Sequence, residues 1–87
     1  MPNNSQQPYR MYSPHLGAMM REVLHTLGDI DVAAEIELEK VEASALDPRS
    51  KEATKGTIRA AHREKRQPYV DLLETLRRRQ HCQSLAA

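Results

Sequence analysis

Apolar residues recur through the first half of the chain at alternating steps of mostly four and three residues. This spacing places them on one face of a helix, as in helices that pack against another helix along their length. Ser13 is a favourable N-cap and Pro14 suits the first helical position, so the sequence predicts a first helix over residues 14–46. Its apolar face comprises Leu16, Met20, Val23, Leu27, Ile30, Ala34, Leu38, Val41 and Ala45.

A weaker apolar pattern follows Asp47 and Pro48, which repeat the combination of a cap and a proline. It predicts a second helix over residues 49–80. Each helix is expected to be about 48 Å long at a rise of 1.5 Å per residue. The two can therefore pair antiparallel along their whole length, with facing residue numbers that sum to about 95. The expected apolar face of the second helix is Thr54, Ile58, Ala61, Lys65, Tyr69, Leu72 and Leu76.

Two residues interrupt these patterns. Gly28 lowers helix stability by about 1 kcal/mol in a helix interior, and Asp29 can cap a new helix. A break at Gly28 is therefore an alternative, although the apolar pattern favours a continuous helix. Pro68 removes a backbone hydrogen bond and predicts a kink near Glu64. We therefore expect a disordered N-terminal tail over residues 1–12, a hairpin domain over 13–80 and a frayed C-terminal tail over 81–87.

The apolar pattern widens toward the open end of the hairpin, where the helices have their free ends. Leu24 and Leu73 lie roughly 60 to 80° from the centres of the apolar faces, where we do not expect the other helix of the same chain to cover them. The 87 residues include no Phe or Trp and one cysteine, Cys82, so the core is small and has no internal disulfide. Association of two chains is the expected means of stabilisation, with a folded-back N-terminal tail as the alternative. The predicted interface of the homodimeric four-helix bundle is Leu16, Met19, Met20, Val23, Leu24, Leu27, Tyr69, Val70, Leu72, Leu73 and Leu76.

Acidic residues dominate the first helix beyond Asp29, and basic residues dominate the second helix. They lie along one flank of each helix, and in antiparallel helices these flanks fall on the same side. Exposed ion pairs contribute only about 0 to 1 kcal/mol each, but they select the pairing and its register. The expected pairs are Glu39 with Lys55, Glu35 with Arg59 and Asp31 with Arg63.

Polar side chains also lie on or beside the apolar faces at the middle of the hairpin. His62 and Lys65 are expected there, opposite Asp31 and Glu37. The simpler interpretation is that they fix register and oligomer order, as polar residues do in coiled coils. The functional alternative is a pH-sensitive or partner-binding site.

Basic residues gather at the open end, near Tyr9 and Tyr12, and predict a weak anion-binding patch. The formal net charge of +1 gives little long-range attraction for phosphates, and no helix-turn-helix, basic zipper or zinc-finger pattern is present. A nucleic-acid-binding regulator is therefore an alternative rather than the main interpretation. The patch comprises Arg10, Arg21, Arg77, Arg78 and Arg79, with His15 and His81 nearby.

Glu22 and His25 have the Glu-x-x-His spacing of di-iron four-helix bundles, and Glu74 is expected near them. A ferritin-like metal-binding bundle is therefore a second alternative. The helical positions of Glu22 and His25, however, fall on the back of the first helix, away from its apolar face. No nucleophile-and-base set and no glycine-rich phosphate loop appears in the sequence. We therefore predict no metal, no cofactor and no catalytic activity.

The sequence thus favours an all-α chain, a long antiparallel helical hairpin that pairs into a four-helix bundle dimer. The expected function is that of a small non-enzymatic interaction or regulatory protein that acts through this homo-oligomer and binds a further protein partner. No apolar run approaches the roughly 20 residues of a membrane span, and the N-terminus lacks the pattern of a signal peptide. We therefore expect no membrane association and a cytoplasmic location.

Overall fold

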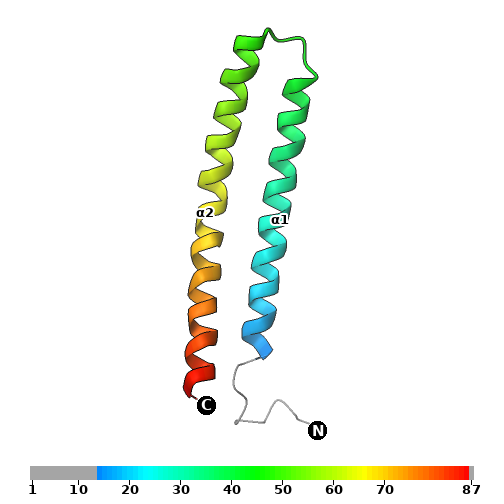
Figure 1. Ribbon diagram of the computed structural model, residues 1–87. Helices are drawn as coiled ribbons and strands as arrows, with labels where there is room; N and C mark the ends of the chain where they lie inside the picture. Colours follow the sequence, from blue (N-terminus) through cyan, green and yellow to red (C-terminus); the bar gives the residue numbers. More distant parts are fainter. Residues whose placement is uncertain (1–13, 87) are drawn as a thin grey trace.

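The protein is a two-helix antiparallel hairpin in the computed structural model, which describes residues 14–86 (Figure 1). Helix α1 spans Pro14–Glu42 and helix α2 spans Pro48–Ala86. The hairpin measures 62 × 25 × 12 Å, so it is a single layer of two helices side by side. The predicted all-α hairpin is confirmed. The expected tail over residues 1–12 and the Ser13 cap lie outside the described residues.

The turn between the helices is held by side chains at both of its ends. Asp47 caps α2, because its carboxylate accepts hydrogen bonds from the Ser50 backbone N–H (2.8 Å) and the Ser50 hydroxyl (3.2 Å). At the other end, the Ser44 hydroxyl donates to the carbonyl of Val41 (2.6 Å). The ammonium of Lys51 reaches back from α2 to the carbonyl of Glu42 (2.7 Å). A cation at this position satisfies a free carbonyl and offsets the negative end of the helix dipole.

The helices differ from the sequence prediction at their C-terminal ends, whereas the continuous first helix that the apolar pattern favoured is confirmed. Helix α1 ends at Glu42, four residues before the predicted end, because Ser44 and Lys51 bond its last carbonyls and stop the helix there. It continues through Gly28 without a break, since the apolar residues on either side stay in phase. Helix α2 continues through Pro68 and extends over residues 81–86, where the sequence predicted a frayed tail.

The core of the hairpin lies at its open end. Val70, Met19 and Met20 pack against this core and are half-buried. Toward the turn, the side chains between the helices are only half-buried, so the apolar packing is uneven along the hairpin. The buried side chains among the described residues are Leu16, Val23, Leu27, Leu73 and Leu76.

The face that α2 turns toward α1 is rotated relative to the prediction. Four of its expected residues are exposed, and the residue after each of them is more buried. This rotation brings aliphatic side chains to the core at the open end and a polar pair to the middle of the hairpin. The expected residues Ala61, Lys65, Tyr69 and Leu72 are replaced at the interface by His62, Arg66, Val70 and Leu73.

Neither helix contains an apolar stretch long enough to cross a membrane, within the residues that the structure describes.

Leu76 is 1% exposed and lies in the core, so we expect the stability of the hairpin to depend strongly on this side chain. Replacing Leu76 with alanine is expected to lower the free energy of unfolding by about 2 to 5 kcal/mol, because it removes packed methyl groups and leaves a cavity. Urea denaturation followed by circular dichroism measures this change. The matched control is Leu85→Ala, because Leu85 is 73% exposed and its loss is expected to stay within about 0.5 kcal/mol. Equal effects of the two substitutions would contradict the position of the core.

Candidate functional site

The predicted interface residues separate into two groups in the structure. Leu16, Val23, Leu27, Leu73 and Leu76 are buried within one chain. The prediction that Leu73 escapes cover by α1 is therefore wrong. The rotation of α2 turns Leu73 inward, and it is only 8% exposed. The predicted interface residues that keep surface outside this core are Met19, Met20 and Val70, which are half-buried, and Leu24, Tyr69 and Leu72, which are exposed.

A polar cluster joins the helices at the middle of the hairpin. Nε2 of His62 lies 2.6 Å from Oδ1 of Asp31, and Nε of Arg66 donates to the same oxygen at 3.1 Å. An ionised carboxylate only accepts hydrogen bonds, so the proton of this contact lies on His62 Nε2. The hydrogen bond from His62 holds the pKa of Asp31 below its ordinary value, and Arg66 adds to the effect. All three side chains are half-buried.

The four residues expected at this mid-hairpin position are not all together. His62 contacts Asp31 and also lines a groove together with Lys65 and Glu37, which are exposed, whereas Asp31 does not line that groove. Arg66 is the member that the sequence analysis missed. Its position one helical turn after His62 was the available signal, because residues four apart in a helix lie side by side.

A second group of ion pairs lies near the turn. The ammonium of Lys55 contacts a carboxylate oxygen of Glu42 at 2.6 Å and one of Glu52 at 3.2 Å. Hydrogen bonding and charge from Lys55 lower the pKa of Glu42, and the two carboxylates raise the pKa of Lys55. Ion pairs thus connect α1 and α2 at two points along the hairpin, one at Lys55 and one at Asp31.

The three predicted ion pairs do not form, and the partners lie about one turn away. Lys55 pairs with Glu42 rather than Glu39, and Asp31 pairs with Arg66 rather than Arg63. Arg59 forms no ion pair with a residue of the described range. Side chains lean toward the N-terminus of their own helix, so in an antiparallel pair the contacting residues are displaced from those whose Cα atoms are level.

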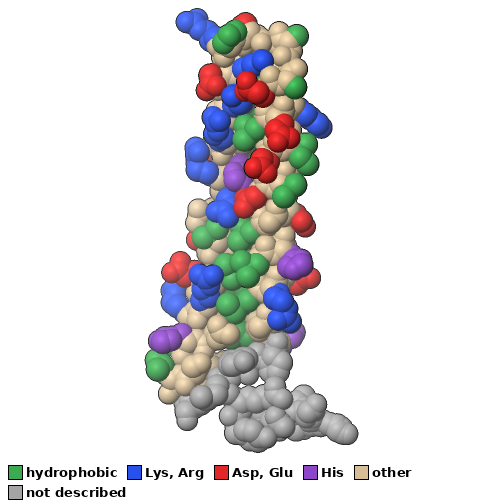
Figure 2. Space-filling model, turned by 45° about the vertical axis from the view of Figure 1, so that its right-hand side comes forward, with side chains coloured by type: hydrophobic (Ala, Val, Ile, Leu, Met, Phe, Trp, Pro, Cys, Tyr) green, Lys and Arg blue, Asp and Glu red, His purple; other side chains and the backbone are tan. Residues whose placement is uncertain are grey.

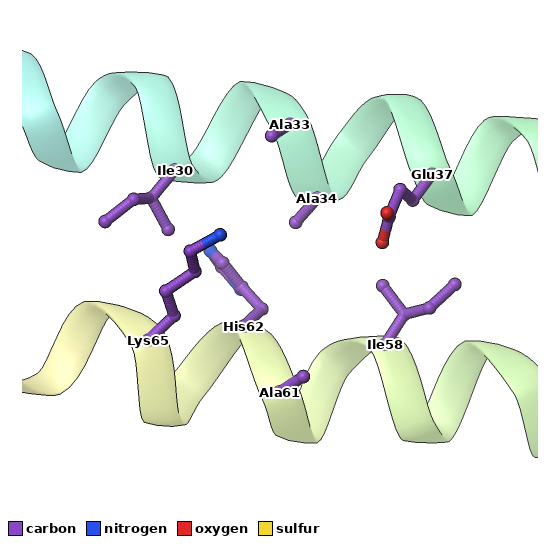
Figure 3. Close-up of a pocket in the computed structure, with 8 residues that line it drawn as sticks. All are labelled: Ile30, Ala33, Ala34, Glu37, Ile58, Ala61, His62 and Lys65. Carbon is purple, nitrogen blue, oxygen red and sulfur yellow. The ribbon is translucent and has the colours of Figure 1, made fainter.

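The other side of the hairpin holds a groove between the helices (Figure 3). Its volume is about 120 Å³. Alanines form its middle, and their methyl groups are too short to fill the space between the backbones, whereas Lys65 and Glu37 stand toward its two ends. The residues that line it are Ile30, Ala33, Ala34, Glu37, Ile58, Ala61, His62 and Lys65.

The predicted basic patch is divided between separate surfaces. Arg21 borders a hollow formed by α1 alone. Arg77 and Arg78 border a different hollow on α2, together with Glu74 and His81. Arg79 is exposed on α2, and Arg10 lies outside the described residues.

The residues of the metal alternative are also separated. Glu22 and His25 are exposed and border the hollow on α1, whereas Glu74 borders the hollow on α2. Within residues 14–86, no three His, Cys, Asp or Glu side chains lie in a group that could hold a metal ion.

Comparison of the chain with protein-family models, with curated proteins and with solved structures finds no match.

The polar cluster predicts that Arg66 contributes to stability and that Arg63 does not. Replacing Arg66 with glutamine removes a cation beside Asp31, so the melting temperature is expected to fall more at low salt than at high salt, because salt screens the lost attraction. Thermal denaturation at two salt concentrations measures the difference. Arg63→Gln is the matched control, since Arg63 is exposed and has no ion pair within the described residues. A similar salt-dependent loss in both variants would show that Asp31 is not the selective partner of Arg66.

The lowered pKa of Asp31, Glu42 and Asp47 also predicts acid sensitivity. Their contribution to stability is present above about pH 4 to 4.5, the ordinary pKa range of carboxyl groups in an unfolded chain, and is lost as the pH falls through the lower folded pKa. The free energy of unfolding is therefore expected to decline between about pH 5 and pH 3. Urea denaturation at several pH values in this range measures the decline. The decline should be smaller in the variant Asp31→Asn. A wild-type stability that stays constant over this range would contradict it.

Proposed function

We propose that the chain is a small non-enzymatic interaction protein that self-associates, two hairpins forming a four-helix bundle that a further protein partner recognises. The single observation that carries the proposal is the exposure of large hydrophobic side chains on a hairpin one layer thick. Leu24 is 47% exposed and Leu72 is 42% exposed, and Tyr69 lies close to the same level of the hairpin. Leu24 lies on one side of the hairpin and Leu72 on the other, so both sides keep apolar surface that a second chain can cover.

The small size of the core supports this proposal. Five side chains are buried within the described part of the hairpin, and Leu76 alone is less than 2% exposed. A core of this size contributes little stability to a domain below about 70 to 80 residues, and such domains commonly gain the rest through disulfides, metals or association. The only cysteine, Cys82, cannot form an internal disulfide. Association with a second copy supplies the missing cover for both chains at once.

The shallow form of the hollows on the hairpin supports a role in binding rather than in catalysis. The groove between the helices measures about 120 Å³ and the two hollows on single helices about 290 and 340 Å³. Small-molecule sites are typically clefts of about 300 to 1,000 Å³ that enclose most of their ligand. The hollow on α2 reaches this volume, but the residues of one helix line it and they do not enclose a ligand. A surface with shallow hollows and exposed leucines is better suited to the side chains of another helix.

The test of this function is the mass of the chain in solution and its dependence on concentration. Light scattering at micromolar concentration is expected to give twice the chain mass of 9.9 kDa. Helical circular dichroism should decrease on dilution, because separated hairpins lose the cover on their apolar side chains. The double variant Leu24→Asp with Leu72→Asp, which places charges on both sides of the hairpin, is expected to prevent association. A wild-type chain that is a stable monomer at all concentrations would rule the proposal out.

A further inference from the structure

The two helices are held together by different contacts in the two halves of their length. Toward the turn, ion pairs cross between them, and the one nearest the middle of the hairpin joins Asp31 to Arg66. Toward the open end, buried aliphatic side chains hold them, beginning with Leu27 in α1 and Leu73 in α2. Figure 2 shows acidic and basic side chains meeting along the upper half of the molecule and hydrophobic side chains continuing below them. Residues 31–66 therefore form a turn half, and the rest of the described chain forms an open-end half.

A residue that weakens a helix lies near the boundary between these halves in both helices. Gly28 lies in α1, three residues before Asp31, and Pro68 lies inside α2, two residues after Arg66. Asp31 contacts both His62 and Arg66, so the facing residue numbers of this antiparallel pair sum to about 95. Gly28 and Pro68 therefore lie at nearly the same level of the hairpin, on opposite helices.

Packing does not account for a glycine at position 28. Gly28 is exposed, and a Cβ atom added to it would contact no other part of the protein within 4 Å. Its effect is therefore on the backbone of α1, because glycine has more conformational freedom than alanine in a helix. Pro68 has no N–H group, so the carbonyl of Glu64 receives no hydrogen bond from it, and the proline ring is crowded against that carbonyl. Both helices are thus weakened at one level.

We propose that Gly28 and Pro68 form a hinge, about which the turn half and the open-end half bend as two rigid bodies. The shared level of the two residues carries this inference. A weak point in one helix alone would be held straight by the intact helix packed beside it, whereas two weak points at one level let both helices bend together. The hinge belongs to the single hairpin and does not depend on the proposed self-association. It lets the hairpin follow a curved partner while the contacts within each half stay in place.

The shape of the hairpin sets the direction of the bend. The molecule extends 25 Å across its two helices and only 12 Å through the layer that they form. A bend within this layer would stretch one helix and compress the other, whereas a bend toward either broad face leaves both helices at equal length. No hydrogen bond or ion pair of the described residues joins position 28 or 29 of α1 to position 67, 68 or 69 of α2, so the bend breaks none.

Residual dipolar couplings of the backbone N–H groups test the hinge, because they report the orientation and the motion of each half separately. In the wild-type chain, the two halves are expected to require alignment tensors of different magnitude. In the double variant Gly28→Ala with Pro68→Ala, this difference is expected to be lost, and one tensor should fit the whole hairpin. Alanine strengthens both helices at these exposed positions, so the variant is expected to stay folded.

The single variant Gly28→Ala tests whether the two positions act together. Its first helix is strengthened while Pro68 remains in the second. If the helices bend only together, this substitution in α1 is expected to remove most of the difference between the two tensors. A Gly28→Ala variant that keeps the whole wild-type difference would overturn the hinge, because α2 would then bend without α1.

Gly56→Ala is the matched control. Gly56 is also helical and exposed, and a Cβ atom added to it likewise contacts no other part of the protein within 4 Å. It lies within the turn half rather than at its boundary, so the substitution is expected to leave the difference between the tensors unchanged. A wild-type hairpin whose halves share one tensor would overturn the hinge. A loss of the difference in Gly56→Ala as large as in the double variant would overturn its position.

Discussion

The packing of α2 against α1 at the open end is the interaction on which the rest of the structure depends. Leu73 and Leu76 bring α2 against Leu16, Val23 and Leu27, and no other described group of side chains is buried. This contact sets how α2 is rotated about its own axis. The rotation in turn places His62 and Arg66 beside Asp31, and it leaves Ala61 and Lys65 lining the groove between the helices.

The sequence was sufficient to predict where the helices begin, to within one residue, and that they form an antiparallel hairpin. Asp47 and Pro48 form a strong local signal, because a capping carboxylate and a proline act on the residues beside them, and the structure has the expected hydrogen bonds from Ser50. The end of α1 was harder to predict. It depends on Lys51, which is nine residues from Glu42 in sequence and reaches it only after the chain has turned.

The rotation of α2 could not be predicted from its own pattern. Residues 58–76 contain two sets of positions with helical spacing, one through Lys65 and Leu72 and the other through Arg66 and Leu73, and neither set is wholly apolar. The choice between them depends on α1, where Asp31 attracts Arg66 and the buried leucines accommodate Leu73. Of the candidate site, the sequence therefore indicated the polar residues at mid-hairpin, whereas the alanine groove became visible only with the two helices in place.

The uneven core has a consequence for how the hairpin moves. The buried side chains lie at residues 16–27 and 73–76, whereas the half near the turn is held by exposed ion pairs and by caps. Contacts of that kind open at lower free energy than buried apolar contacts. The covalently joined end of the hairpin is thus expected to be its looser end, with backbone amides that exchange with solvent sooner than those beside Leu76. Closing the short turn costs little chain entropy, so we expect this half to separate and re-form locally while the open end stays packed.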